Sequence, residues 1–67
     1  MNSKLIGEIL TDLRKEKGKT TTEAAKDLGI TVSALSNYES GIRIPRDNIK
    51  IRIADYYDKP IAAIFYT

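Results

Sequence analysis

The residue types that usually carry out covalent or acid–base chemistry are scarce in this chain. Its 67 residues include no His and no Cys, which most nucleophile–base pairs and most zinc sites require. Asp55 and Asp58 come closest to a pair of catalytic carboxylates, but an i, i+3 acidic pair is more simply a solvated helix surface. The composition therefore argues against an enzyme. It also gives no sign of a metal, a cofactor or a small-molecule ligand.

A different chemistry, hydrogen bonding to the edges of DNA bases, suits the side chains of residues 32–37. On a helix that starts at residue 32, with about 100° between residues, one face carries four small uncharged residues, Val32, Ser33, Ser36 and Asn37. An Asn side chain can pair with adenine, a Ser with several base edges, and a Val with the thymine methyl group. The same face is also compatible with plain exposure to water, because short polar residues are common on protein surfaces.

Three glycines mark the ends of the helices that must position this face. Gly18, Gly29 and Gly41 are 11 and 12 residues apart, and each follows a segment with helical character. The first segment begins after Asn2 or Ser3 as its cap. Its apolar stripe consists of Leu5, Ile6, Ile9, Leu10 and Leu13.

The second and third segments form a helix-turn-helix pattern. Thr20 and Glu23 match the capping box at the start of the second, whose buried face is predicted to be Ala24, Ala25 and Leu28. Thr31 is an N-cap for the third, which runs from Val32 to about Ser40 with Ala34, Leu35 and Tyr38 facing inward. A three-residue link that contains Gly29 joins the two.

The segment after Gly41 allows two interpretations. Residues 49–53 alternate like a strand, but a strand here has only residues 42–44 as a partner, and an isolated hairpin is marginal. The helical alternative places Ile49, Ile53, Tyr56 and Tyr57 on one face, and we favour it. A last short helix over residues 61–66 follows Pro60.

Net charge and location are less informative. The 11 Lys and Arg residues exceed the nine Asp and Glu residues by two, which is weak evidence for a polyanionic partner. No stretch approaches the ~20 apolar residues of a membrane span, and Glu8 interrupts the first apolar run too early for a signal peptide. We expect a complete small cytoplasmic protein with no membrane partner.

Taken together, these positions resemble the Cro/cI-type (Xre-like) helix-turn-helix family of phage repressors and bacterial transcriptional regulators. The most specific part of the similarity is residues 28–31 followed by residues 38–45, and it extends without gaps over nearly the whole chain. The resemblance implies an all-α fold, a compact five-helix lambda-repressor-like domain over residues 1–67. Its helix-turn-helix covers about residues 20–41, and its third helix lies in the major groove.

The resemblance also implies which residues contact DNA. Val32, Ser33 and Asn37 fall where family members contact bases, with Ser36 close by. The implied phosphate contacts are Thr21, Arg43, Arg46 and, less strongly, Lys19. Thr21 replaces a Gln that often binds a phosphate in the family. No residue of the third helix is cationic, so we expect recognition that leans towards A·T pairs.

The resemblance pairs Arg14 with Glu39 in a structural ion pair between the first and third helices; the alternative is that both are solvated surface charges. Two positions depart from the family pattern. Ala24 replaces a commonly larger apolar residue. Asp47 stands where an apolar residue is usual, so the start of the fourth helix could differ.

A domain of this size reads few base pairs, so we expect a homodimer on a short inverted repeat with half-sites about 34 Å apart. The apolar C-terminal residues predict the dimer interface: Ile61, Ile64, Phe65 and Tyr66. The alternative is that they fold onto the domain's own core.

The leading functional prediction is a sequence-specific DNA-binding transcriptional regulator, a small phage or mobile-element repressor. The alternative is a protein-interaction module on the same fold, of the antitoxin or anti-repressor type. That alternative requires the apolar C-terminus to bind a different protein.

Overall fold

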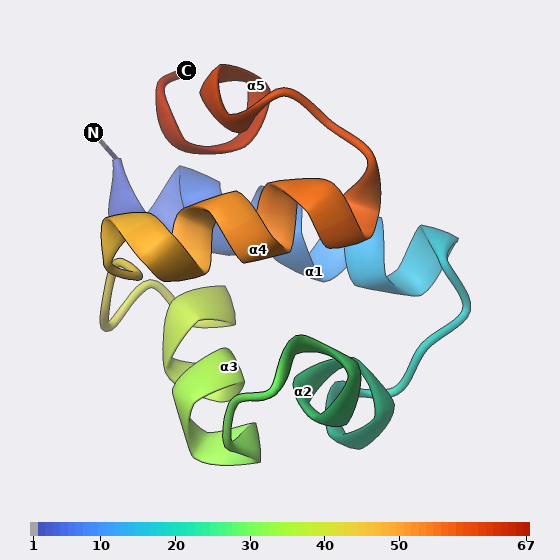
Figure 1. The fold of residues 1–67 in the computed structure, drawn as a ribbon. Helices are drawn as coiled ribbons and strands as arrows, with labels where there is room; N and C mark the ends of the chain where they lie inside the picture. The colour runs from blue at the N-terminus through green and yellow to red at the C-terminus, as the bar shows by residue number, and fades with distance from the viewer. Residues whose placement is uncertain (1) are drawn as a thin grey trace.

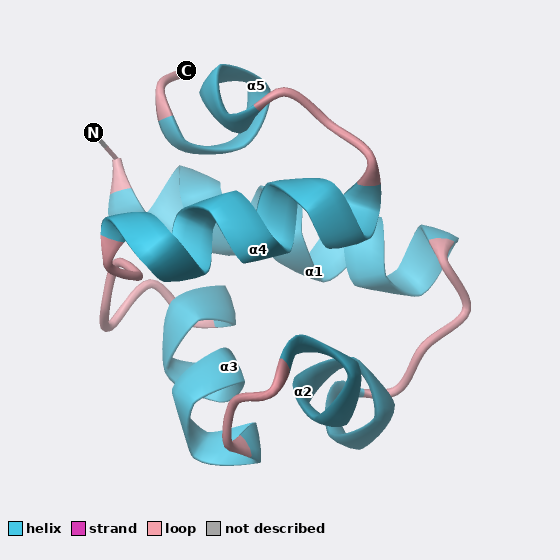
Figure 2. Cartoon of the chain, viewed as in Figure 1, coloured by secondary structure: helices cyan, strands magenta, loops and turns pink. Residues whose placement is uncertain are grey.

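A computed structural model describes residues 2–67, and every regular element within that range is an α-helix (Figure 1). The helices are α1 (Ser3–Glu16), α2 (Thr21–Leu28), α3 (Val32–Glu39), α4 (Asp47–Tyr57) and α5 (Ile61–Phe65). Short loops join them, with no strand in the described part of the chain (Figure 2). The predicted all-α architecture of five helices is confirmed. No helix within residues 2–67 combines the length and the apolar character that crossing a membrane requires.

Local capping signals begin the first three helices as predicted. The Asn2 side chain accepts a hydrogen bond from the Leu5 amide at 3.1 Å. Thr20 and Glu23 form the reciprocal capping box, at 3.1 and 2.9 Å, and the Thr31 hydroxyl accepts from the amide of the third helical residue at 3.0 Å. These bonds satisfy amide groups that a helix start otherwise leaves without a partner.

The alternating segment 49–53 is helical and lies within α4. The helical period buries Lys50, Ile53 and Tyr57, whereas Ile51 is 56% exposed. The buried lysine was not anticipated from the sequence. Its aliphatic stem lies inside, while its ammonium group is 3.3 Å from the Tyr66 hydroxyl and 3.6 Å from an Asp47 carboxylate oxygen. This arrangement connects the C-terminal residues to the first turn of α4.

Every helix contributes at least one fully buried side chain to the core. These residues include Leu10, Leu28, Leu35, Ile53 and Phe65, each exposed by 1% or less. Ala24 and Ala25 are also buried, as the thin apolar face of α2 predicted. Within this shared core, α3 packs mainly against α1 and α2, which therefore fix its position.

The C-terminal residues correct one prediction. Ile64 and Phe65, predicted at a dimer interface, are 1% and 0% exposed and belong to the protein's own core. The alternative that this segment folds onto the domain is the one the structure shows, because α5 packs against α1 and α4 (Figure 1). Ile61 is half-buried against the same core, and Tyr66 is 55% exposed.

A glycine inside α1 allows α3 to approach closely. A β-carbon on Gly7 would lie 2.8 Å from the backbone carbon of Glu39 and 2.9 Å from the backbone oxygen of Tyr38. Backbone atoms of a helix cannot rotate away as a side chain can, so only glycine fits at this crossing. The sequence analysis did not single out this glycine, because it marks no helix end.

We expect Gly7→Ala to destabilise the fold by about 2 kcal/mol, since the clash with the α3 backbone outweighs the gain of about 1 kcal/mol in helix propensity. Denaturant unfolding measures this difference. Glu8→Ala is the matched control, because Glu8 is exposed on the same helix and should change stability by less than about 0.5 kcal/mol. A Gly7→Ala protein as stable as the parent would show that the two helices can separate without cost.

Candidate nucleic-acid interface

The three-residue link between α2 and α3 turns the chain sharply, and Figure 1 shows the two helices running in clearly different directions. Gly29 makes the turn possible: its φ is +72°, and its amide donates to Ala25 and Lys26 carbonyls at the end of α2. The side chain of Arg52 on α4 donates to the Leu28 carbonyl at 3.0 Å, which supports the same helix end. The turn is therefore held both locally and from α4.

The two faces of α3 lie as predicted. Leu35 is fully buried, and Ala34 and Tyr38 are half-buried. The opposite face presents Val32, which is 42% exposed, together with exposed Ser33 and Ser36 and half-exposed Asn37. Within residues 2–67, none of the four side chains takes part in a hydrogen bond or a salt bridge. We call these four residues the reading face, and their polar groups are free to bind a partner.

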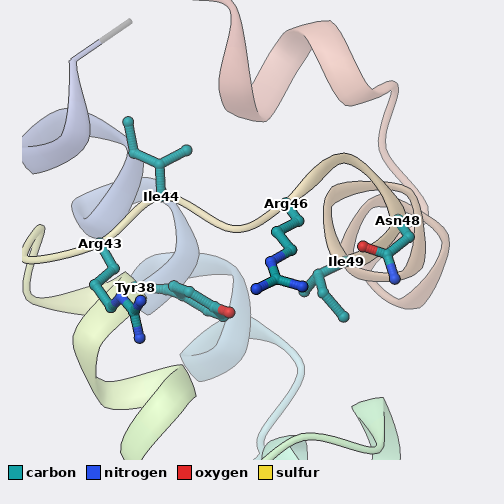
Figure 3. Close-up of a pocket in the computed structure, with 6 residues that line it drawn as sticks. All are labelled: Tyr38, Arg43, Ile44, Arg46, Asn48 and Ile49. Atoms are coloured by element: carbon teal, nitrogen blue, oxygen red, sulfur yellow. The ribbon is translucent and has the colours of Figure 1, made fainter.

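The predicted phosphate contacts come from two segments beside α3. Arg43 and Arg46 are exposed on the connection between α3 and α4, where both line one open pocket (Figure 3). Thr21 is half-buried as the first residue of α2, and the amide groups of the first turn of a helix can bind a phosphate. Lys19 lies 3.7 Å from the Asp27 carboxylate, so its charge is partly engaged within the chain.

A match to a family model identifies the family of this chain. A helix-turn-helix family model matches residues 10–64, which include all of α2, α3 and α4. The chain belongs to the Xre-like helix-turn-helix family. That family consists of DNA-binding transcriptional regulators rather than enzymes.

Relatives within this family come from archaea and a phage. The chain is 33% identical, over 58 residues, to a Pyrococcus furiosus protein named as an HTH-type transcriptional regulatory protein. It is 39% identical, over 54 residues, to the ImmF control region 10 kDa protein of Bacillus phage phi105. These matches cover 87% and 81% of this chain, but only 18% of the archaeal protein and 60% of the phage protein.

A solved structure shares the helix-turn-helix fold. The crystal structure of the clp gene regulator ClgR from C. glutamicum superposes with a TM-score of 0.82 over 98% of this chain and 86% of that chain. The two sequences are only 20% identical. The likeness therefore concerns the arrangement of the helices alone.

An ion pair fixes α3 of this helix-turn-helix domain against α1. Arg14 donates from Nε and Nη2 to the two carboxylate oxygens of Glu39, at 2.9 and 3.1 Å. The same guanidinium group donates to the Lys19 carbonyl at 2.9 Å, and Thr11 donates to Glu39 at 3.3 Å. The two charged side chains are only 13% and 10% exposed, so the predicted pair is confirmed and is not a solvated surface contact. The hydrogen bond to Glu39 is the main cause that raises the Arg14 pKa.

We expect Arg14→Met to lower the free energy of unfolding by about 3 kcal/mol, because it leaves the Glu39 carboxylate buried without a cation. The double variant Arg14→Met with Glu39→Leu should recover most of the loss, since it removes both charges. Lys19→Ala is the control: it breaks an exposed pair and should cost less than about 1 kcal/mol. Equal losses in the three variants would contradict a special role for the buried pair.

A second connection, between α4 and α2, was not predicted from the sequence. The Tyr56 hydroxyl donates to the Asp27 carboxylate at 2.6 Å, and the Lys17 ammonium lies 4.8 Å from the centre of the Tyr56 ring. The hydrogen bond from Tyr56 is the largest cause that lowers the Asp27 pKa. The two residues are 29 positions apart, so no short-range sequence pattern predicts the contact.

Tyr57 lies buried at the end of α4, and its hydroxyl has no hydrogen-bond partner within residues 2–67. Burial is the main cause that raises its pKa to about 12, from an ordinary value of 10. Between these two values the unfolded chain loses the phenol proton while the folded chain keeps it. The stability that the neutral phenol contributes is therefore complete below pH 10 and is lost as the pH rises towards 12.

We expect thermal unfolding temperatures to fall as the pH rises above 10, and Tyr57→Phe to reduce that fall because it removes the titrating group. At pH 7 the variant should be as stable as the parent or slightly more stable, since a buried hydroxyl without a partner is costly. Calorimetry from pH 7 to 11 measures both effects. An unchanged alkaline slope in Tyr57→Phe would show that Tyr57 ionises as readily in the folded chain as in the unfolded one.

Proposed function

We propose that this domain is a sequence-specific DNA-binding regulator of transcription that reads the major groove with α3. The observation that carries the proposal is the reading face on the second helix of a helix-turn-helix. Its four side chains, three exposed and Asn37 half-exposed, have suitable chemistry and no partner within residues 2–67. Asn37 offers the bidentate pairing that adenine accepts, and Val32 offers an apolar contact for a thymine methyl group. No residue of α3 is cationic, so recognition leans towards A·T pairs.

The phosphate contacts in this proposal come from both neighbouring segments. Arg43 and Arg46 bind phosphates of the DNA backbone beyond the end of α3. Thr21 and the first amide groups of α2 bind phosphates at the start of α2. Lys19 adds positive charge nearby, although part of it is neutralised by Asp27. Such contacts orient the protein on the duplex, while the bases supply the specificity.

A role as a small phage or mobile-element repressor is supported by the relative from Bacillus phage phi105, whose name places it in a control region. This chain spans 60% of that protein and 18% of the archaeal relative, so the comparison supports the DNA-binding part above all. We place this activity in the cytoplasm.

We also propose that the domain binds an inverted repeat as a homodimer. Of the C-terminal residues first assigned to the interface, Ile61 and Tyr66 remain at the surface at least in part, and Ile64 and Phe65 are excluded by their burial. The same burial weakens the alternative of a protein-interaction module, because that function requires the apolar C-terminus to bind a different protein, and Ile64 and Phe65 lie in the core.

Selection of bound duplexes from a random DNA pool tests the proposal directly. We expect a short inverted repeat, rich in A·T pairs, with half-sites about 34 Å apart, and an affinity that falls with added salt. Sedimentation with and without the selected duplex gives the number of protomers bound. Failure to enrich any sequence would reject the proposal.

On the selected duplex, Asn37→Ala should weaken the binding free energy by about 1–3 kcal/mol and relax the preference at one base pair. The cause is the loss of a bidentate contact to one base. Titration of duplexes with each substituted base pair, followed by fluorescence anisotropy, measures both effects. Asn48→Ala is a suitable control, because Asn48 is an equally polar, exposed residue on α4 and should leave base preference unchanged. A preference unaffected by Asn37→Ala would show that α3 is not the reading helix.

A further inference from the structure

An open pocket of about 290 Å³ lies between the end of α3 and the start of α4. Its lining residues are Tyr38, Arg43, Ile44, Arg46, Asn48 and Ile49. Figure 3 shows the guanidinium groups of Arg43 and Arg46 on either side of the Tyr38 ring, with the Asn48 side chain further along. The walls thus carry two cations, a phenol hydroxyl and a carboxamide, and no carboxylate.

The carboxylates nearest in sequence are engaged with other cations. Glu39 binds Arg14 at 2.9 Å, and Asp47 lies 3.6 Å from the Lys50 ammonium. Within residues 2–67, neither Arg43 nor Arg46 forms a salt bridge or a side-chain hydrogen bond. Two like charges on one pocket repel each other, so an anion from outside the chain would stabilise this arrangement.

We propose that Arg43 and Arg46 bind one and the same phosphate group of the DNA backbone in this pocket, not two separate phosphates. The inference rests on the proposed function and specifies how that function uses this surface. Guanidinium groups form strong, directional hydrogen bonds with phosphate oxygens. The Tyr38 hydroxyl, whose ring lies between the two guanidinium groups in Figure 3, supplies a further donor to the same group.

The pocket is coupled to the reading face through the backbone. The Asn37 carbonyl accepts hydrogen bonds from the Ile42 amide at 3.0 Å and the Arg43 amide at 3.2 Å. Tyr38, which lines the pocket, follows Asn37 directly and packs against the core. A phosphate held here therefore sets the position of α3 along the groove and aligns Asn37 with one base pair.

Methylphosphonate scanning of the selected duplex tests whether the phosphate is shared. Each phosphate in turn is made neutral, and the affinities of the parent, Arg43→Gln and Arg46→Gln are measured. On the unmodified duplex each variant should bind roughly tenfold more weakly. At one and the same methylphosphonate position, both variants should bind within about twofold of the parent, because the charge that both arginines contact is gone. Both side chains are exposed, and circular dichroism checks that the variants fold.

The salt dependence gives an independent measure. Loss of one shared phosphate contact should reduce the slope of log affinity against log salt by about 0.9 per protomer in the double variant, whereas two separate phosphates would reduce it by about 1.8. Lys59→Gln is the control cation, because Lys59 lines a different pocket, between α1 and the end of α4, and should leave both affinity and slope unchanged.

Three results would overturn the proposal in distinguishable ways. If Arg43→Gln and Arg46→Gln match the affinity of the parent at two different methylphosphonate positions, the two arginines contact separate phosphates. The proposed function would remain intact. If the Arg43→Gln, Arg46→Gln double variant binds the duplex as tightly as the parent, and only the parent binds inorganic phosphate, the pocket binds free phosphate and not the DNA backbone. A parent protein that binds no duplex would reject the proposed function itself.

Discussion

The contact between α1 and α3 is the constraint on which the rest of the structure depends. At Gly7 the two helices approach so closely that no β-carbon fits against the α3 backbone. Near the other end of α1, Arg14 holds the Glu39 carboxylate through two hydrogen bonds and also binds the Lys19 carbonyl. A steric limit and a buried ion pair therefore fix the distance and the rotation of α3. Both are needed to keep its polar face outward, because α3 is only eight residues long and too short to be stable alone.

The distribution of charge follows from the same packing. Cations that stabilise the fold have partners within the chain: Arg14 with Glu39, Lys19 with Asp27, and Lys50 with Asp47 and Tyr66. Arg43 and Arg46 have none in the described part of the chain, and they lie beside the uncharged reading face. A net charge of only +2 thus conceals a local separation: several cations are paired with groups inside the chain, whereas Arg43 and Arg46 remain available at the surface. Net charge alone is a poor guide to nucleic-acid binding when several of the cations have partners within the chain.

The C-terminal segment shows how a fold this small completes its core. Phe65 is the largest of its fully buried side chains, and α5, which carries it, packs against α1 and α4. The buried Lys50 stabilises this end, because its ammonium lies over the rings of Phe65 and Tyr66 and near the Tyr66 hydroxyl. Ile64 and Phe65, which the sequence predicts at an interface with a partner, lie instead in the domain's own core. In a chain of 67 residues with no disulfide, the burial of Ile64 and Phe65 adds apolar area that a small core needs.

The sequence by itself determined the first three helices, their caps and the outward position of the reading face, because these depend on short-range chemistry. Thr20 and Glu23 are three positions apart, the glycines stand at helix ends, and the helical period alone turns Ser33 and Asn37 away from Leu35. The Arg14–Glu39 pair was predicted only through family resemblance. The tertiary structure decided what depends on distant segments: the fit of Gly7 against α3, the hydrogen bond from Tyr56 to Asp27, the burial of Lys50, and the inward position of Ile64 and Phe65. It also placed Arg43 and Arg46 at one pocket, on either side of the Tyr38 ring, because the packing of α4 against the other helices positions the connection between α3 and α4.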